Sequence, residues 1–197
     1  MIVVSGPAGS GKGTVNARLL ATGEFVYSVS ATTRAPRPGE VDGVNYHFVT
    51  REEFLSRIDS GDMLEYTEYC GNFYGTPRST AQAAIDAGKN IILEIEVNGA
   101  RQVKENCPEA VMIMLLPPSF AEQERRLRGR ATDSEESILK RLKQTHEELH
   151  QLALYDYVVI NREGESEEAA KDIMAIVRAE KCARRRNAEM ERIYFEN

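Results

Sequence analysis

The sequence predicts an α/β fold in which a parallel sheet is flanked by helices and carries two inserts, a small mixed β unit and a helical lid. Short β-branched runs alternate with helix signals along the chain, as in proteins built on a parallel sheet. A glycine-rich loop joins the first run to the first helix, and two long stretches interrupt the alternation. The 197 residues suffice for a single domain with a sizeable core.

Composition narrows the functional class. The net charge of −6 argues against a general nucleic-acid binder, and we expect Arg184-Arg185-Arg186 to be a helix-end charge cluster. The apolar runs are shorter than the ~20 residues that span a bilayer, and no secretion signal precedes Ile2. The three cysteines have no disulfide or zinc spacing. We therefore expect a cytoplasmic protein with reduced thiols, without membrane association and without an obligatory protein partner.

Five β-branched runs are expected to form the buried parallel strands, because most of them lack a polar face. The runs are residues 2–5, 26–29, 91–97, 111–116 and 157–160. Helix starts are indicated by residues whose side chains cap free backbone N–H groups or favour the first turn. These are Thr50 with Glu53, Ser119 with Glu122, Thr76 before Pro77 as the first helical residue, and Asp133 or Ser134. Gly88 supplies a helix stop.

Two stretches depart from the β and α alternation. Residues 30–75 contain a Pro- and Gly-rich loop at 34–40 and hairpin signals around Gly71, which predict a small, mainly antiparallel β insert. Residues 119–153 are charged and helical with a break at Gly129, and they favour a mobile lid. The core of the domain then consists of residues 1–29, 76–118 and 154–197.

The loop Gly6-Pro7-Ala8-Gly9-Ser10-Gly11-Lys12-Gly13-Thr14 follows an apolar strand and precedes an amphipathic helix. Its glycines let backbone N–H groups surround an anion, the helix N-terminus adds its dipole, and Lys12 reaches the β- and γ-phosphates of a nucleotide. This is the Walker A arrangement, so the sheet is of the P-loop NTPase type. Gly13 occupies the usual Ser/Thr position for Mg²⁺. We expect phosphate oxygens and water to hold the metal, with Thr14 as the protein contact.

A second phosphate site is indicated in the β insert. Arg34 and Arg37 lie three residues apart on a Pro-flanked loop, with Tyr46 nearby in the sequence. Such a pair can bind a phosphate with two planar guanidinium groups. The pattern alone is also compatible with a solvated arginine loop.

Several motifs in this order resemble guanylate kinase, over about residues 2–161. They are Gly6–Thr14, Ser28–Glu40, Asn45–Phe48, Gly71–Thr76, Leu93–Ala100 and Arg126–Arg130. The resemblance implies ATP-dependent phosphorylation of GMP and dGMP with Mg²⁺, on a core with a GMP-binding insert and a lid. Ala8, Glu96 and Asn98 depart from the residues most frequent at these positions, and none of the three departures removes a charged catalytic group.

The resemblance also implies roles for single residues. The GMP phosphate would be bound by Arg34, Arg37, Tyr46 and Tyr74, and the guanine by Ser30, Glu65 and Thr76. The phosphates of ATP would contact the whole Gly6–Thr14 loop, Arg126 and Arg130, and Asn161 would contact the adenine. Arg141 would reach the reacting centre, which makes Lys12, Arg34, Arg130 and Arg141 the catalytic set.

Glu94 and Glu96 end the run predicted as the third core strand. We expect them to point to different sides, so that only Glu94 enters the site, near the GMP ribose or the water shell of the metal. Glu96 would instead be a charge at the N-terminus of the next helix.

Three other functions are compatible with parts of this pattern. A non-catalytic guanylate-kinase-like scaffold is disfavoured by the intact Gly11-Lys12 loop. A kinase for another phosphorylated acceptor, such as a ribose bisphosphate, would have no use for Glu65 and Thr76 as readers of a base. A GTPase switch would need a Ser/Thr directly after the lysine and an N-K-x-D motif, and the sequence has neither.

Overall fold

The computed structural model describes residues 1–129 and 134–196. It contains a five-stranded core sheet in the order β2-β7-β1-β8-β9, with every neighbouring pair parallel. The strands are β1 (Ile2–Ser5), β2 (Phe25–Tyr27), β7 (Asn90–Glu94), β8 (Val111–Leu116) and β9 (Tyr157–Ile160). The predicted α/β class and the parallel core sheet are confirmed, and β1, which leads into the glycine-rich loop, is the central strand.

Two predicted strand boundaries were wrong. The run at 26–29 forms β2 only to Tyr27, and the run at 91–97 forms β7 only to Glu94. Val97 begins a helix, α4 (Val97–Asn106), and is buried together with Gly99, Ala100 and Val103. Burial of this helical face on the sheet overrides the β propensity of a single valine.

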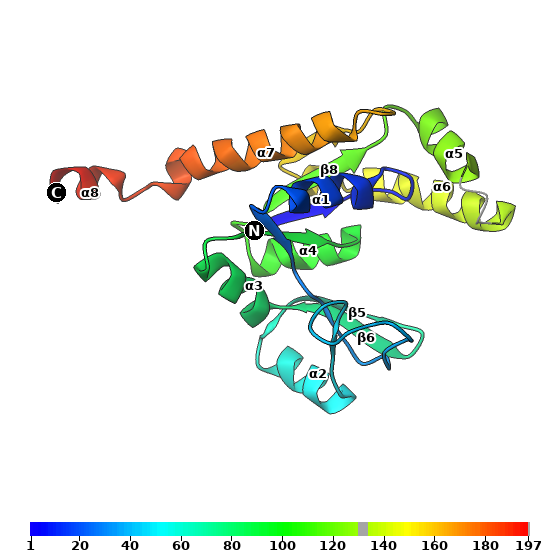
Figure 1. The fold of residues 1–197 in the computed structure, drawn as a ribbon, viewed down its shortest axis with the longest axis horizontal. Coiled ribbons are helices and arrows are strands. Elements are labelled where there is room, and N and C mark those ends of the chain that lie inside the picture. The colour runs from blue at the N-terminus through cyan, green and yellow to red at the C-terminus, as the bar shows by residue number, and fades with distance from the viewer. Residues whose placement is uncertain (130–133, 197) are drawn as a thin grey trace.

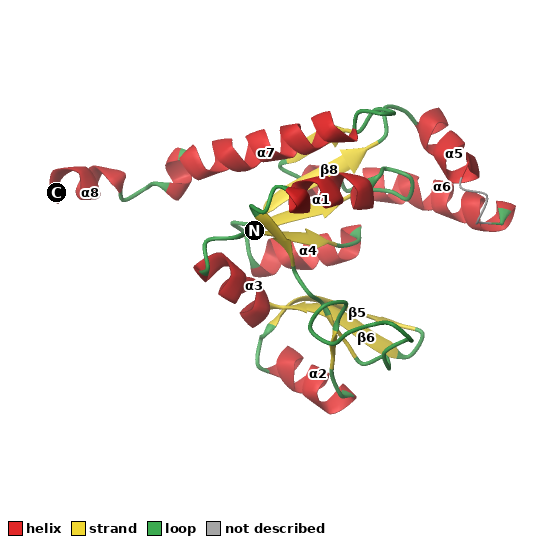
Figure 2. Ribbon diagram, in the orientation of Figure 1, coloured by secondary structure: helices red, strands yellow, loops and turns green. Residues whose placement is uncertain are grey.

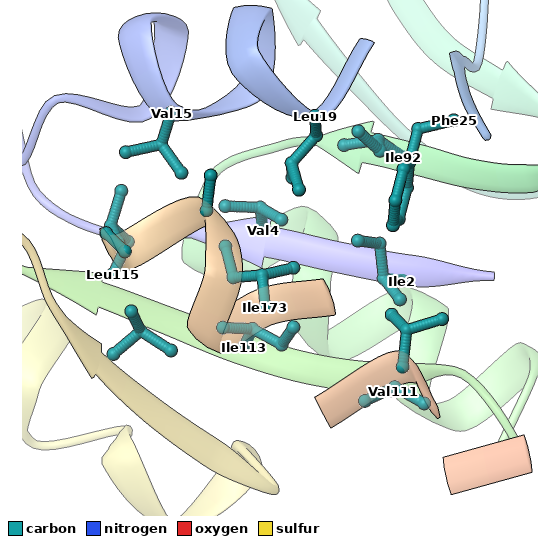
Figure 3. Packing of buried hydrophobic residues seen from close by; sticks show 14 residues of the cluster. Ile2, Val4, Val15, Leu19, Phe25, Ile92, Val111, Ile113, Leu115 and Ile173 are labelled. Atoms are coloured by element: carbon teal, nitrogen blue, oxygen red, sulfur yellow. The ribbon is translucent and has the colours of Figure 1, made fainter. Parts of the chain in front are cut away.

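Helices cover both faces of the core sheet (Figure 1). On one face, α1 (Lys12–Ala21) and α7 (Ser166–Cys182) contribute Val15, Leu19 and Ile173 to a core with Ile2 and Val4 (Figure 3). On the other face, α3 (Arg78–Asp86) and α4 pack against Val3 and Leu93. Because neighbouring residues of a strand face opposite sides, the short β1 strand serves both cores.

Most of the predicted helix boundaries are confirmed. Thr50 and Glu53 form a reciprocal capping box at α2 (Arg51–Asp59), and Ser119 Oγ accepts from the Glu122 N–H at the start of α5 (Phe120–Gly129). Ser134 caps α6 (Glu135–Leu149), while the alternative cap, Asp133, lies outside the described residues. Gly88 follows α3 with a φ of +75°, which favours glycine.

The predicted start of α3 was wrong. Pro77 is the residue before the helix, which begins at Arg78. Thr76 belongs to a strand, and its hydroxyl donates to Glu65 instead of capping the helix. Thr76 pairs with Glu65 and Pro77 with Met63 in a hairpin, so both residues stay extended and the helix starts after them.

The β insert forms a second sheet of four strands in the order β4-β3-β6-β5 (Figure 2). Its strands are β3 (Ala31–Thr32), β4 (His47–Phe48), β5 (Met63–Tyr69) and β6 (Asn72–Pro77). The β3–β4 pair is parallel and the other two pairs are antiparallel. The β5–β6 turn consists of Cys70 and Gly71, both with positive φ, as in a tight hairpin.

The insert has a small apolar core of its own. Helix α2 places Phe54 on Phe73, with ring centroids 5.2 Å apart, and Ala31 and Met63 complete the cluster. Because this cluster is separate from the two cores of the parallel sheet, the insert keeps its shape through its own packing.

The region predicted to be a lid, residues 119–153, contains α5, α6 and a short 3₁₀ helix at Leu152–Leu154. Leu127 from α5 packs with Ile138 and Leu142 from α6, and Ala8 of the glycine-rich loop contacts this cluster. The lid helices therefore rest against the loop. No helix in the described part of the chain is both long and apolar enough to cross a bilayer.

The C-terminal end of α7 is held by a buried carboxylate. Glu180 is 4% exposed and accepts from Tyr157 Oη at 2.6 Å, from Arg186 Nε at 2.9 Å and from Arg185. The arginines of the helix-end cluster thus pair with an acid beneath them. Burial acts to raise the pKa of Glu180, and these three hydrogen bonds outweigh it and lower the pKa to about 2.

Beyond this point α8 (Met190–Glu196) extends away from the body (Figure 1) and buries none of its residues.

Glu180→Gln is expected to lower the free energy of unfolding at neutral pH by about 3 kcal/mol, because each unit of pKa shift corresponds to about 1.4 kcal/mol. The pKa of Glu180 is lowered on folding, so its contribution is complete above its ordinary value of 4.5 and is lost as the pH falls toward 2. Denaturant unfolding of both proteins from neutral to acid pH checks this. Glu167→Gln on the exposed side of α7 is the control, and a Glu180→Gln deficit that stays constant with pH would contradict the prediction.

Candidate active site

The glycine-rich loop needs glycine at two positions for steric reasons. Gly6 has a φ of +152°, and a Cβ there would lie 2.1 Å from the carbonyl oxygen of Leu115. Gly11 has a φ of +89°, and a Cβ there would lie 2.3 Å from Asn161 Nδ2. The loop therefore lies directly against β8 and β9, at the carboxyl ends of the core strands, where parallel sheets bind ligands.

The lysine of the loop bends back over it. Lys12 is the first residue of α1, and its Nζ donates to the carbonyl oxygens of Gly6 at 2.6 Å and Pro7 at 3.4 Å. The ammonium group is thus at the mouth of the loop, beside the N-terminus of the helix. Both the charge and the helix dipole favour an anion at this point.

Two buried amide side chains support the loop from outside. Asn161 donates through Nδ2 to the carbonyl oxygen of Ser10 at 2.8 Å. Gln123, from α5, donates through Nε2 to the carbonyl oxygen of Ala8 at 2.9 Å and to Thr145 of α6 at 2.7 Å. The second amide therefore connects the loop to both α5 and α6.

A cavity of about 870 Å³ opens at the loop. It joins the loop, the end of β7, the tip of the β5–β6 hairpin and one face of α6. The lining residues are Gly6, Pro7, Ala8, Gly9, Gly11, Lys12, Gly13, Thr14, Tyr69, Glu94, Ile95, Glu96, Ser137, Lys140, Arg141, Gln144 and Glu148. Of the predicted site residues, the cavity therefore brings Thr14, Glu94 and Arg141 together with Lys12 and most of the loop.

The expectation that only Glu94 enters the site was wrong, because Glu96 lines the same cavity. Residues two apart in extended chain face the same side, and β7 ends at Glu94 with Glu96 still extended before α4. The predicted place of Glu96 at a helix N-terminus is confirmed, since it is the residue before α4.

The arginine loop of the insert forms a compact cationic and aromatic cluster. The Arg34 guanidinium lies 5.6 Å from the ring centroid of Tyr46, and the Tyr46 and Tyr74 rings meet edge to face at 6.1 Å. Arg34 also pairs with Glu40 at 2.9 Å, while the Arg37 side chain is exposed. Three of the four residues predicted to bind one phosphate are thus close together, and Glu40 occupies one side of Arg34.

A buried carboxylate lies on the neighbouring strand of the insert. Glu65 is 7% exposed, and its Oε1 accepts from the Thr76 hydroxyl at 2.7 Å. Gly99, in the first turn of α4, lies beside this carboxylate. A Cβ added at Gly99 would be 3.1 Å from Glu65 Oε2, so a larger residue there would press on the carboxylate. Burial raises the pKa of Glu65. Ser30, the third residue predicted to read the base, precedes β3 and is half-buried.

The comparisons with known proteins agree with this arrangement. A sequence model of guanylate kinase matches residues 1–180. The chain belongs to the guanylate kinase family. The match reaches through most of α7, so the predicted end of the resemblance near residue 161 was too early.

Relatives of this family member match nearly its whole length. It is 54% identical to a guanylate kinase of Halalkalibacterium halodurans over 190 residues, which is 96% of this chain and 92% of the relative. A guanylate kinase of Thermus thermophilus is 50% identical, over 96% of this chain and 84% of the relative. The crystal structure of guanylate kinase from Anaplasma phagocytophilum matches with a TM-score of 0.67 and 39% identity, over 93% of this chain and 86% of the other.

Of the residues predicted for the ATP side that the structure describes, Ser10, Arg126 and Asn161 are not among those that line the loop cavity. Arg126 donates to Glu122 at 2.8 Å and to the carbonyl oxygen of Asn161 at 2.9 Å, which ties α5 to the end of β9. Asn161 is 5% exposed behind the loop. Arg130 lies outside the described residues. The nucleotide contacts of these four residues stay predictions.

Sequence reasoning missed the face that α6 presents to this cavity. Ser137, Lys140, Arg141, Gln144 and Glu148 line it, and only Arg141 was predicted. Their spacing of three and four residues puts them on one side of a helix. That periodicity could have identified the whole face once Arg141 was placed in the site.

Proposed function

We propose that this family member is a cytoplasmic phosphotransferase that moves the γ-phosphoryl group of ATP to GMP or dGMP, and so returns GMP to the purine nucleotide pool as GDP. Membership of the guanylate kinase family supports this activity, as does sequence identity of 54% and 50% to two named guanylate kinases. The observation that carries the choice of acceptor is the buried Glu65 carboxylate with its Thr76 partner. Guanine offers N1–H and the 2-amino group as adjacent donors, which match the two oxygens of a carboxylate.

The reaction needs no general base, because the attacking phosphate oxygen of GMP is already anionic. Catalysis then depends on holding the two phosphate groups in line and on neutralising their charge. We assign Lys12 and Arg141 in the loop cavity to the ATP side, together with Arg126 and Arg130. Arg34, Arg37, Tyr46 and Tyr74 of the insert would bind the acceptor phosphate.

We assign residues 30–75 to GMP and residues 119–153 to a lid over ATP. The arginine cluster and Glu65 are absent from the residues that line the loop cavity. The insert and the core must therefore approach each other for transfer. Such closure would also exclude water, which would otherwise compete as the acceptor.

The same cavity has donors suited to Mg²⁺. Mg²⁺ prefers oxygen ligands and keeps several waters, and the Thr14 residue and the Glu94 carboxylate both line the cavity. A Cβ on Gly13 would meet nothing within 4 Å, which leaves room for a hydrated ion beside the loop. We propose that Thr14 and Glu94 hold the metal, directly or through water. When bound, the metal neutralises charge on the phosphates.

The test of this function is a coupled assay of the purified chain with ATP against GMP, dGMP, AMP, CMP and UMP. We expect turnover with the two guanine nucleotides and at least ~10²-fold lower kcat/KM with the others. Equal turnover of AMP, or turnover of a ribose bisphosphate in place of GMP, would reject the assignment. Binding of GMP without turnover would favour a non-catalytic scaffold.

The two cationic groups are expected to affect different kinetic constants. Arg34→Ala and Arg37→Ala should raise the GMP KM by roughly tenfold, since each removes a charge-assisted contact to the acceptor. Arg141→Ala should mainly lower kcat, by about 10²-fold, because its charge is used in the transition state, and Arg130→Ala should behave alike. Steady-state kinetics with both substrates measures this, with the exposed Arg178→Ala on α7 as control. A change confined to the ATP KM in all four variants would show that the insert does not bind GMP.

A further inference from the structure

Glu94 lies where three elements of the core meet. It ends β7, and its backbone is in register with Val4 of the central strand, two residues before the loop begins. Asn16 lies one helical turn after Lys12 on α1, so the two side chains share a face of that helix. Tyr27 ends β2 on the other side of β7. The carboxyl ends of parallel strands meet at one edge, which places all three side chains beside the loop.

Both neighbours donate to the same oxygen of Glu94. Asn16 Nδ2 lies 2.9 Å from Oε2, and Tyr27 Oη lies 3.1 Å from Oε2. A glutamate on its own can rotate about three side-chain bonds. Donors from α1 and from β2 restrict the orientation of the carboxylate by engaging Oε2.

The two donors differ in what else they contribute. Asn16 is fully buried, and its Oδ1 has no hydrogen-bond partner among the described residues. An amide that makes one hydrogen bond and leaves a buried oxygen unpaired adds little to stability. The main polar contact of Asn16 is therefore its hydrogen bond to Glu94. Tyr27 is 38% exposed, and its phenol hydroxyl donates to Glu94.

We propose that Asn16 and Tyr27 are positioning residues that hold Glu94 toward the phosphates for the transfer step. The proposal rests on the phosphotransferase function stated above and extends it to two residues outside the loop and the insert. Glu94 shares its cavity with Lys12, Thr14 and Arg141. Neither Arg34 nor Glu65, the anchors proposed for GMP, lines this cavity. Misorientation of Glu94 should therefore lower kcat and leave the GMP KM unchanged.

The experiment is a double-mutant cycle between Tyr27→Phe and Glu94→Gln. Tyr27→Phe keeps the ring and removes only the hydroxyl, so the fold should persist. We expect Tyr27→Phe to lower kcat on the order of tenfold, as for the loss of one hydrogen bond to a charged acceptor, with the GMP KM within about twofold. In a Glu94→Gln background, the same change should alter kcat by less than about twofold, because Tyr27 acts through the carboxylate.

Asn16→Leu is a second arm of the cycle, because leucine is also branched at Cγ and cannot donate. Circular dichroism checks the folded fraction of Asn16→Leu before kinetics. If this variant does not fold, the cycle between Tyr27→Phe and Glu94→Gln tests the proposal by itself. The control is Tyr66→Phe, since Tyr66 is 39% exposed and lies in the insert.

Additive effects of Tyr27→Phe and Glu94→Gln would overturn the proposal, as would a change in the GMP KM alone. Neither result would affect the proposed function, which depends only on turnover of ATP and GMP by the unmodified chain. Absence of that turnover would refute the function before the cycle begins.

Discussion

Glu65→Gln is expected to reduce kcat/KM for GMP by roughly 10²- to 10³-fold and to narrow the preference for GMP over AMP. The physical reason is the matching of donors and acceptors in a buried place. An ionised carboxylate only accepts, so it pairs with N1–H and the 2-amino group of guanine. Glutamine replaces one acceptor by a donor, which then faces a guanine donor. Adenine has an acceptor at N1 and no 2-amino group, and it would leave the wild-type carboxylate unpaired.

The measurement is kcat/KM for GMP and AMP in wild type, Glu65→Gln and a matched control. Glu68→Gln is the control, because Glu68 lies on the same strand, is half-exposed and pairs only loosely with Arg51 at 3.5 Å. Circular dichroism establishes that each variant is folded. An unchanged GMP to AMP ratio in folded Glu65→Gln would mean that the guanine is read elsewhere.

Lys12→Ala is expected to retain the fold and to lower kcat by about 10²- to 10³-fold or more. Lys12 is at the mouth of the loop and bends back over Gly6 and Pro7. The loop N–H groups and the helix dipole remain in the variant, so part of the ATP affinity should persist. What is lost is the mobile charge between the β- and γ-phosphates, where charge changes most during transfer.

Single-turnover and steady-state assays of Lys12→Ala, with Lys171→Ala as control, measure this loss. Lys171 pairs with exposed glutamates on α7, and surface pairs of this kind contribute little to stability. Near-wild-type kcat in folded Lys12→Ala would reject the Walker A role of the loop. Retained GMP binding without transfer would agree with separate acceptor and donor sites.

The sequence predicted the elements where local and tertiary preferences agree. The Thr50 and Glu53 capping box, the stop at Gly88 and the parallel pairing of the core strands all follow from patterns that tertiary packing does not oppose. It was less reliable where packing decided. Val97 favours a strand by its propensity, but packing on the opposing sheet face places it in a helix. Thr76 has the pattern of a helix cap, but its hydroxyl donates to Glu65, which is distant in the sequence.

The candidate site also contains one part that local sequence predicts and other parts that depend on packing. The glycine-rich loop could be predicted in full, because its residues are contiguous and their chemistry requires that order. The cationic and aromatic cluster needed the resemblance to include Tyr74, since Tyr74 comes from β6 while Arg34 and Tyr46 lie outside the strands of the insert. The α6 face was missed although its spacing around Arg141 was available in the sequence, whereas nothing near Tyr69 in the sequence indicates which way a hairpin tip will point.

By itself, the sequence determined the fold class, the phosphate-binding loop and the family. Each of these depends on residue order within short segments, where backbone geometry relates spacing directly to shape. Only the tertiary structure decided that Glu94 and Glu96 share one cavity, that Asn16 and Tyr27 meet on a single oxygen of Glu94, and that Glu180 gathers two arginines at the end of α7. These contacts join residues from different strands and helices, and their distances follow from how the layers pack. Burial then sets the strength of each contact, because a carboxylate removed from water depends on the donors that the fold places around it.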